Sequence, residues 1–366
     1  MSRKPKGLQS TLQVRLYPTA EQGRLLMAHC QEYISTVNVL SSALDADLIA
    51  HDDRFSTKDF VAALPSCVKN QALRDARSVF KRSLKLACLP VLKKPYCQWN
   101  NQNWQMTGTA LIVPVCIDGK TQQIEIACQG LIFAGTPGIC RIKRKRGKWV
   151  ADLVITTEEP EPTEGQGVMG VDLGIKVPAV AYVQGKGTRF YGNGRYQRYM
   201  RRRFYARRKK LQKAGKMRAV KKSQGKEARW MKNLNHQLSR QIVTHAQEQG
   251  VGTIRLEALR GIRTRTTRTS RRASDRKNNR MKHSWSFHQL TLFITYKAAS
   301  VGIKVEQVDP AYTSQECPSC GAHNTAQDRT YVCEDCGWFG HRDKVGAIAI
   351  SRRTGLSDKR RGATGA

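Results

Sequence analysis

Four cysteines near the carboxyl end of the chain constrain its fold most strongly. They form two C-x-x-C pairs separated by twelve residues, Cys317 with Cys320 and Cys333 with Cys336. Thiolates at this spacing can complete a tetrahedral Zn²⁺ site, because each pair supplies two ligands from a tight turn. Four thiolates leave no open coordination position, so we expect a structural zinc ribbon and not a catalytic metal. Gly321 and Gly337 each follow a second cysteine, as such a turn requires.

The charge of the chain indicates a polyanionic partner. There are 64 lysines and arginines against 28 aspartates and glutamates, a formal net charge of +36 at pH 7. Such a surplus would repel a compact fold unless a polyanion is bound, so we expect nucleic acid as the partner. An acidic membrane surface is the alternative. It is disfavoured because no apolar run reaches the ~20 residues of a membrane span, and the basic stretches are not consistently amphipathic.

The amino-terminal segment and the remaining cysteines predict a reducing compartment. Residues 1–10 are basic and lack the apolar core of a secretory signal. We therefore expect a cytoplasmic protein that is associated with the nucleoid when bound to DNA, and we expect no disulfides. The seven cysteines without paired spacing are interpreted as small buried side chains: Cys30, Cys67, Cys88, Cys97, Cys116, Cys128 and Cys140.

The first part of the chain is predicted to combine helices with an antiparallel β module. Residues 11–17 alternate apolar and polar side chains as a strand does, and Pro18 and Thr19 then open a helical stretch. Residues 57–92 also have a helical pattern, broken at Pro65. Between residues 108 and 157, short β-branched runs alternate with Asp-Gly, Gln-Gly and Arg-Gly turns. This pattern predicts an antiparallel module, with a small barrel as its expected form.

An acidic, proline-broken segment at residues 158–165 predicts a domain boundary. After it, residues 168–182 have the pattern of a strand, a glycine turn and a second strand. Residues 195–282 contain 29 lysines and arginines against 4 acidic residues, which creates the strongest positive field in the chain. The first half of this region is predicted to be helical, and residues 261–282 to be a loop that meets a phosphate backbone.

Basic and aromatic side chains are interleaved on the predicted helix at residues 201–210. Bases can stack on such aromatic rings while the cations contact phosphates. A solvated helix face or a localisation signal is the alternative, and the net charge favours nucleic acid. The predicted contacts are Arg201, Arg202, Arg203, Tyr205, Arg207, Arg208, Arg271, Arg272 and Arg329.

Three separated carboxylates, Asp172, Glu257 and Asp343, are candidate metal ligands. The first two lie within apolar strand patterns, where an unpaired charge is costly to bury without a partner or a metal. Asp343 precedes a helix that starts with small residues. Carboxylates are preferred Mg²⁺ ligands, and two such ions roughly 4 Å apart support phosphodiester hydrolysis. Carboxylates from three elements can meet at one edge of a ribonuclease-H-like sheet.

Each of these carboxylates also has a purely structural interpretation. Asp172 or Glu257 can pair with an arginine of this basic chain, and Asp343 can cap the helix ahead of it. The three together favour a metal site. Their order, Asp, Glu, Asp, differs from the common transposase arrangement in which the glutamate comes last.

Several ordered motifs resemble the TnpB family, which are transposon-encoded ancestors of type V CRISPR effectors. The motifs are Val-Met-Gly-Val-Asp at 168–172, Ile-Arg-Leu-Glu at 254–257, Pro-Ala-Tyr-Thr-Ser-Gln-Glu-Cys at 310–317, Cys-Glu-Asp-Cys-Gly at 333–337 and Arg-Asp at 342–343. Residues 15–22, Arg-Leu-Tyr-Pro-Thr-Ala-Glu-Gln, resemble the opening strand and helix of the family. The resemblance spans nearly the whole chain.

This resemblance implies an RNA-guided DNA endonuclease of a transposable element. It implies a guide RNA, a target DNA with a short flanking motif, and Mg²⁺- or Mn²⁺-dependent cleavage by Asp172, Glu257 and Asp343. Base pairing would then supply sequence specificity while the protein reads backbone shape.

The implied fold is mixed α/β, with several domains. A wedge-type β-barrel (1–18 and 93–160) carries a helical recognition insert (19–92). A ribonuclease-H-like RuvC nuclease domain (161–312 and 341–353) is split by the zinc ribbon (313–340), and a disordered basic tail (354–366) follows.

The sequence departs from the family pattern just after Asp343. The family usually has Asp-x-Asn-Ala-Ala with a later Asn, whereas Lys344, Val345 and Gly346 follow here. Related proteins that have lost nuclease activity act as guided repressors, so a nuclease-silent, RNA-guided DNA-binding repressor is the alternative function. A zinc-ribbon RNA-binding protein is a third interpretation, and the three carboxylates argue against it.

Overall fold

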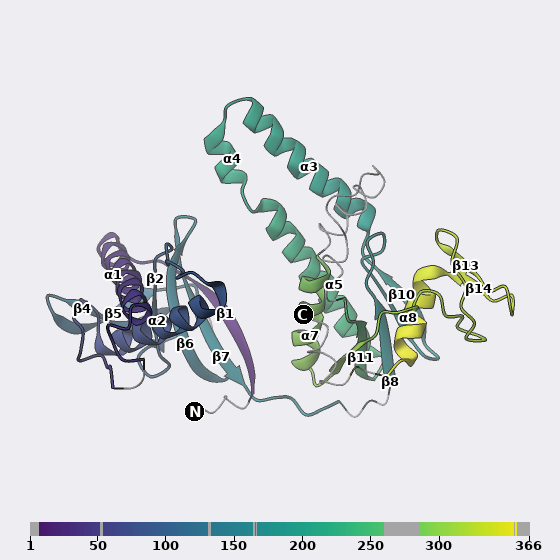
Figure 1. Ribbon diagram of the computed structural model, residues 1–366, viewed down its shortest axis with the longest axis horizontal. Coiled ribbons are helices and arrows are strands. Elements are labelled where there is room, and N and C mark those ends of the chain that lie inside the picture. Colours follow the sequence, from purple (N-terminus) through teal and green to yellow (C-terminus); the bar gives the residue numbers. More distant parts are fainter. Residues whose placement is uncertain are drawn as a thin grey trace. The chain divides into compact units, whose positions relative to one another are not determined.

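The computed structural model describes residues 7–51, 54–130, 133–163, 165, 167–259, 286–354 and 356 (Figure 1). The chain divides into two compact units, Met1–Glu158 and Glu159–Ala366. This division falls at the acidic, proline-broken segment. The predicted basic loop at 261–282, with Arg271 and Arg272, lies outside the described residues, as does the tail apart from Thr354 and Leu356. No helix in the described ranges is long and apolar enough to cross a membrane.

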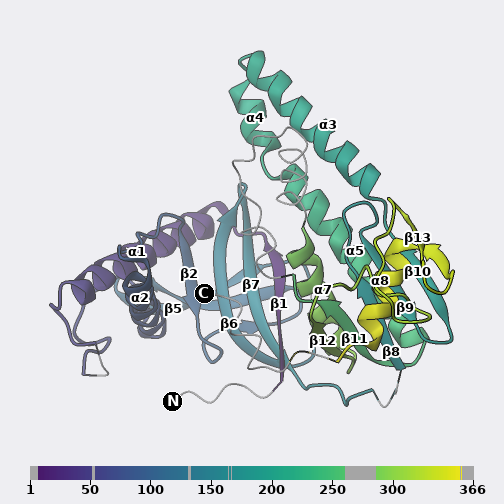
Figure 2. The same ribbon diagram turned by 45° about the vertical axis from the view of Figure 1, so that its right-hand side comes forward.

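The first unit contains two antiparallel sheets (Figure 2). One sheet has the order β1-β7-β6-β2 and the other the order β3-β4-β5. The strands are β1 (Leu8–Leu16), β2 (Tyr96–Trp99), β3 (Gln105–Met106), β4 (Ala110–Ile117), β5 (Lys120–Ala127), β6 (Thr136–Lys145) and β7 (Lys148–Thr157). Every neighbouring pair is antiparallel, as the turn residues predict. Closure of this module into a barrel stays a prediction.

Two helices pack with these sheets, α1 (Ala20–Asp45) and α2 (Ser66–Leu86). Helix α1 begins where the sequence predicts because Thr19 and Gln22 form a capping box. The Gln22 N–H donates to Thr19 Oγ1 at 3.2 Å, and the Thr19 N–H donates to Gln22 Oε1 at 3.1 Å. Helix α2 begins only after Pro65, so the helix predicted across 57–92 is too long at both ends. Tyr33 of α1 and Trp99 of β2 are fully buried in the shared core.

Most of the unpaired cysteines are buried or half-buried, as predicted. Cys30, Cys97, Cys128 and Cys140 are buried, and Cys67 and Cys116 are half-buried. The prediction is wrong for Cys88, which is exposed. Cys88 follows Ala87, which ends α2 in a left-handed conformation with φ of 52°, so the chain has already left the helix face that packs on the core.

The second unit is built on one mixed sheet of order β10-β9-β8-β11-β12. Its strands are β8 (Gly167–Asp172), β9 (Ala179–Val183), β10 (Gly187–Tyr191), β11 (Val251–Glu257) and β12 (Lys304–Val308). Strand β9 is antiparallel to both of its neighbours, β8 and β10. Strand β11 is parallel to both of its neighbours, β8 and β12.

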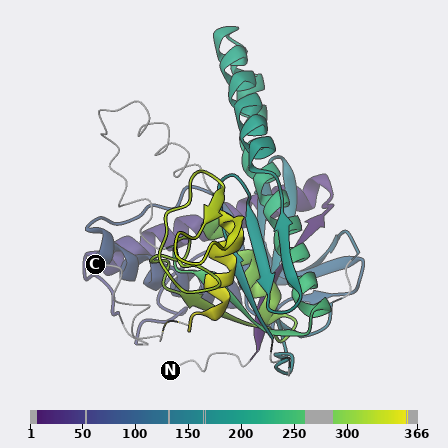
Figure 3. The same ribbon diagram turned by 90° about the vertical axis from the view of Figure 1, so that its right-hand side faces the viewer.

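Helices cover both faces of this sheet (Figure 3). The chain between β10 and β11 forms α3 (Gly194–Lys213), α4 (Met217–Ser223) and α5 (Lys226–Glu248), and α7 (Phe287–Ala299) precedes β12. Leu238 and Ile242 of α5 and Ile294 of α7 bury the apolar side chains of one face. Helix α8 (Arg342–Arg352) packs on β8, β9 and β11. The short strands β13 (Thr330–Val332) and β14 (Phe339–His341) precede α8.

Candidate active site and zinc ribbon

Asp172 and Glu257 lie side by side at the carboxyl ends of two parallel strands. Strands β8 and β11 are hydrogen-bonded neighbours whose register pairs Val171 with Leu256. The next residue of each strand is a carboxylate. Because successive side chains alternate between the two faces of a sheet, Asp172 and Glu257 share the face opposite to the buried Val171 and Leu256. The register therefore brings together two of the three predicted ligands.

Helix α8 brings Asp343 to that same face. A Cβ atom at Gly170 would lie 2.1 Å from the Ala347 carbonyl oxygen, so only glycine allows α8 to pack this closely on β8. On the neighbouring strand, Arg255 Nη1 donates to the Ser351 carbonyl oxygen at 2.8 Å. These two contacts fix the helix over the ends of β8 and β11, with Asp343 in its first turn.

The first turns of α8 approach Asp172 directly. A Cβ atom at Gly346 would lie 3.2 Å from Asp172 Oδ2. Asp343 is not the helix cap: the cap is His341, whose Nδ1 accepts from the Asp343 N–H at 3.2 Å. The capping interpretation of Asp343 is therefore wrong, and its carboxylate is left for other contacts.

The three carboxylates have very different partners. Arg329 donates from Nη1 to Asp343 Oδ2, so the arginine pairing that the sequence allows for the other two carboxylates occurs at this residue. The Thr313 hydroxyl donates to Glu257 Oε1. No described side chain donates a hydrogen bond to the Asp172 carboxylate, which is half-buried. Asp343 is thus ion-paired, Glu257 is hydrogen-bonded, and Asp172 has only the more distant charges of Arg342 and Arg329 to offset its own.

Burial and mutual repulsion dominate the electrostatics of the cluster. Burial raises the pKa of Asp172 well above its ordinary value, and the nearby Glu257 and Asp343 charges raise it further, while the Arg342 and Arg329 charges offset part of this rise. Burial also raises the pKa of Glu257, although the Thr313 hydrogen bond and the Arg353 charge act in the opposite direction. A bound cation would relieve this repulsion, and carboxylate oxygens are the ligands that Mg²⁺ prefers. By its chemistry, this set of oxygen donors therefore suits the predicted metal.

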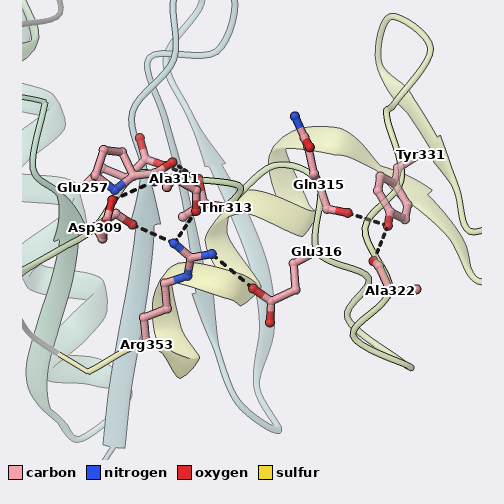
Figure 4. A network of polar contacts seen from close by, with 10 residues as sticks. Glu257, Asp309, Ala311, Thr313, Gln315, Glu316, Ala322, Tyr331 and Arg353 are labelled. Carbon is pink, nitrogen blue, oxygen red and sulfur yellow. Dashed lines mark hydrogen bonds and ion pairs between the residues drawn. The ribbon is translucent and has the colours of Figure 1, made fainter.

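The loop between β12 and the ribbon is held beside the cluster by a residue that sequence reasoning missed (Figure 4). Arg353, which ends α8, donates from Nη1 to the carbonyl oxygens of Asp309 at 2.8 Å and Ala311 at 2.5 Å. Its Nη2 atom also pairs with Glu316 at 3.2 Å. Thr313, in the Pro-Ala-Tyr-Thr-Ser motif, could have been singled out from that motif. Nothing in the local sequence pairs Arg353 with this loop.

The four cysteines of the two C-x-x-C pairs converge in the structure. Their sulfur atoms all lie within 4.8 Å of one another, with Cys317 Sγ 3.6 Å from Cys336 Sγ and Cys320 Sγ 3.5 Å from Cys333 Sγ. Zn–S bonds of about 2.3 Å in a tetrahedron place sulfur atoms about 3.8 Å apart, so the set fits Zn²⁺. In the described part of the chain, no other group of three potential ligand side chains is drawn together as closely.

Both halves of the zinc site have the same backbone turn. Gly321 and Gly337 have φ of 78° and 71°, the left-handed conformation expected of them. The Gly321 N–H donates to the Cys317 carbonyl oxygen and the Gly337 N–H to that of Cys333, each at 3.0 Å. The second turn thus repeats the geometry of the first.

The ribbon and α8 share a small core that explains one departure from the family pattern. Val345 is fully buried in a cluster with Cys317, Tyr331 and Cys333. The residue two positions after Asp343 therefore packs against the ribbon and does not face the carboxylates. An apolar side chain is well suited to that position.

The predicted nucleic-acid contacts on α3 separate into two groups. Arg202, Arg203, Tyr205 and Arg207 are exposed. Arg201 and Arg208 are half-buried and pair with Glu227 of α5, at 4.0 Å and 3.0 Å. These two arginines hold the α3–α5 hairpin together, whereas the exposed group is free to meet a phosphate backbone.

Comparison with known proteins places the fold and the motifs in a family. Residues 152–263 match a family described as "Probable transposase", and residues 287–350 match one described as "Cas12f1-like, TNB domain". A TnpB-like protein of Methanocaldococcus jannaschii is 30% identical over 136 residues, covering 37% of this chain and 47% of that protein. A second protein of that organism, provisionally named a transposase, is 32% identical over 85 residues, covering 20% of this chain and 78% of that protein. The chain belongs to the TnpB family.

Other relatives extend the similarity of this TnpB-family chain beyond those segments. The CRISPR-associated endodeoxyribonuclease Cas12f1 of Sulfoacidibacillus thermotolerans is 28% identical over 225 residues, which cover 57% of this chain but only 50% of that protein. A solved structure of a Cas12f1–sgRNA–target DNA complex has a TM-score of 0.67 at 14% identity, covering 94% of this chain and 99% of that chain. The likeness shows a shared mixed α/β, multidomain fold.

Proposed function

We propose that this TnpB-family chain is an RNA-guided DNA endonuclease of a transposable element. The Cas12f1 relative is named as an endodeoxyribonuclease, and a protein of the same fold has been solved in complex with sgRNA and target DNA. These relatives support the activity and the two nucleic-acid partners. The family described as a transposase supports the transposon context. The net charge of +36 suits a protein that holds two nucleic acids at once.

The carboxylate cluster on the second unit is the proposed catalytic centre. The single observation that carries this assignment is Asp172, a half-buried carboxylate without a described hydrogen-bond donor that faces Glu257 and Asp343. A structural carboxylate in such a setting would have a donor or a cation as its partner. Two divalent ions, when bound, would activate water and stabilise the leaving oxygen of a phosphodiester. Asp172, Glu257 and Asp343 would hold them, and the ordered sheet with α8 keeps these ligands in place.

The domain roles follow from the same proposal. The sheet of order β10-β9-β8-β11-β12 with α8 is the RuvC-type, ribonuclease-H-like nuclease domain, split by the zinc ribbon. The β strands of the first unit form the wedge-type module, and α1 and α2 form the recognition insert. The exposed side chains of α3, namely Arg202, Arg203, Tyr205 and Arg207, contact the nucleic-acid backbone and bases.

RNA that copurifies with the protein tests the guided part of this proposal. A single abundant RNA that ends in a variable segment is the expected result, and bulk ribosomal RNA would argue against guiding. Purified ribonucleoprotein is then incubated in Mg²⁺ with DNA that matches the variable segment beside randomised flanks. Cleavage next to a short flanking motif is expected.

Asp172→Ala tests the catalytic part. This variant should lose cleavage while keeping its RNA and its target DNA, because it removes a metal ligand and leaves the sheet intact. Asp328→Ala is the matched control, since Asp328 is an exposed acid of the same unit that pairs only with Lys176 among its described contacts. If Asp172→Ala still cuts as Asp328→Ala does, the assignment of the catalytic centre is wrong.

A nuclease-silent, RNA-guided DNA-binding repressor is the second candidate. One observation favours it: Arg329 already pairs with Asp343 and so competes with a cation for that ligand. Ribonucleoprotein that binds a matched target but cuts nothing across Mg²⁺ and Mn²⁺ concentrations would support this function. Restoration of cleavage by Arg329→Gln would identify the ion pair as the cause.

A further inference from the structure

Tyr312 has an unusual backbone conformation next to the carboxylate cluster. Its φ is +61°, in the left-handed region that large side chains rarely adopt. The following residue is Thr313, which donates its hydroxyl hydrogen bond to Glu257. Bulky residues persist in such conformations where the surrounding structure imposes them, and they concentrate at functional sites.

The loop around Tyr312 is clamped on both sides. The Gln315 N–H donates to the Tyr312 carbonyl oxygen at 2.9 Å, and the Glu316 N–H donates to it at 3.2 Å. On the amino-terminal side, Arg353 holds the Ala311 carbonyl oxygen (Figure 4). The backbone of Tyr312 is therefore held on both sides, two residues after Pro310 and directly before the Thr313 that contacts Glu257.

The ring of Tyr312 stacks on a side chain of the ribbon and still faces solvent. Its centroid lies 5.5 Å from that of His323, with 17° between the two planes. Tyr312 is 60% exposed, and His323 is exposed as well. A residue that served only the core would not keep a large ring in solvent on a strained backbone. Among the described residues, His323 is the one aromatic side chain that stacks on Tyr312.

We propose that Tyr312, backed by His323, stacks on an unpaired base of the DNA strand that is cut and positions that strand at the carboxylate cluster. This inference rests on the proposed nuclease function and adds a positioning residue to it. Stacking of a base on an aromatic side chain is tolerant of base identity, which suits an enzyme whose sequence specificity comes from a guide. Loss of one such contact weakens strand binding by roughly 5- to 150-fold.

A fluorescent base analogue tests this contact without relying on cleavage. Ribonucleoprotein is bound in EDTA to target DNA in which 2-aminopurine replaces single bases of each strand near the mapped cut. With the unaltered protein, one or two adjacent positions of the cut strand should be quenched by stacking. Tyr312→Phe should keep this quenching, and Tyr312→Ala should abolish it.

Tyr312→Gly separates the role of the ring from that of the backbone. Glycine accepts a φ of +61° without strain, so this variant should be at least as stable to heat as Tyr312→Ala and should keep its zinc. It should nevertheless lose the quenching, and its KM for DNA should rise by roughly 5- to 150-fold while kcat at saturating DNA changes less.

Two outcomes would overturn the proposal. One is quenching that persists at the same positions in Tyr312→Gly and Tyr312→Ala, and the other is unchanged KM in both variants. Failure of the proposed function has a different result: the unaltered protein would not cut DNA in Mg²⁺ at all.

Discussion

Two half-buried aspartates, one from each unit, have opposite kinds of partner. Asp75 of the first unit accepts hydrogen bonds from the Tyr33 hydroxyl at 2.9 Å and the Tyr96 hydroxyl at 2.7 Å. Asp172 of the second unit has no described hydrogen-bond donor and faces the carboxylates of Glu257 and Asp343. Both aspartates are half-buried, so the partners make the difference.

The contrast separates a structural carboxylate from a functional one. Around Asp75, burial and the aspartate raise the pKa of Tyr33 and Tyr96, so both hydroxyls stay protonated and donate. The two tyrosine hydroxyls satisfy the Asp75 carboxylate, so this carboxylate needs no metal ion. Around Asp172 the fold gathers three carboxylates whose mutual repulsion and burial outweigh the nearby charges of Arg342 and Arg329, an arrangement that a bound cation would stabilise. Four changes should distinguish the two regions, and the zinc site has the largest expected effect.

Removal of zinc should damage the Asp172 region and leave the Asp75 region intact. Structural zinc contributes on the order of 10 kcal/mol to the folding of small zinc domains, so Cys336→Ser should unfold the ribbon and release Asp343. Hydrogen exchange should become fast in residues 313–341 and stay slow in the first unit. Cys88→Ser is the control, because Cys88 is exposed and remote in sequence from the ribbon. Equal protection of the ribbon in both variants would contradict the zinc assignment.

Asp75→Ala should destabilise the first unit without affecting the chemistry. Each buried hydroxyl left without an acceptor costs about 1–3 kcal/mol, and this variant leaves two, those of Tyr33 and Tyr96. Denaturant unfolding measures the loss, and Tyr33→Phe should show a smaller one. Cleavage by the folded fraction should be unchanged. A stability equal to that of the unaltered protein would mean that Asp75 is not a structural anchor.

Asp172→Asn should stabilise the metal-free protein, whereas Asp75→Ala should destabilise it. The folded-state pKa of Asp172 is raised above its ordinary value of 3.8, so folding favours the protonated, neutral side chain. As pH rises through the folded-state pKa, the side chain ionises in the folded protein and this contribution to stability is lost. At pH 8 the neutral amide should therefore raise the melting temperature by about 2–4 °C, the shift that about 1 kcal/mol produces in a unit of this size. The gain should shrink as pH approaches 4. A loss of stability at pH 8 would show that Asp172 has a partner that stabilises its charge.

Thr313→Val should have the smallest effect, because it removes one donor from Glu257. The hydrogen bond of Thr313 lowers the pKa of Glu257, so its loss should raise that pKa further and weaken metal binding. The expected cost is about 1 kcal/mol in unfolding and a severalfold rise in the Mg²⁺ concentration for half-maximal cleavage. Thr313→Ser keeps the donor and should behave as the unaltered protein does.

Local signals in the sequence predicted local structure well. Thr19 and Gln22 identify the start of α1, and Gly321 and Gly337 identify the two turns of the zinc site, because caps and turns depend on residues close in sequence. Residues of α3 show the limit of such patterns, because Arg201 and Arg208 share a basic run with exposed arginines and yet pair with Glu227. Whether a helix side chain is exposed depends on what packs against it.

Long-range pairing could not be predicted from residue patterns alone. The neighbouring positions of Asp172 and Glu257 depend on the register of β8 with β11, and residues between 172 and 251 carry no signal of that pairing. That the carboxylates meet was expected from their shared chemistry as metal ligands and from the family resemblance, and not from any pattern that pairs the two strands. The contacts of Arg353 with the 309–316 loop are of the same kind, since they join segments that only the folded sheet brings together.

Binding of Mn²⁺ to RNA-free, zinc-loaded protein tests the central claim most directly. Electron paramagnetic resonance counts the bound ions, and we predict about two per chain in the unaltered protein and in Asp328→Ala. Asp172→Asn should bind fewer ions and bind them more weakly, because it removes the one proposed ligand that has no described hydrogen-bond donor or ion pair. Equal binding by Asp172→Asn and Asp328→Ala would show that the carboxylate cluster is not a metal site.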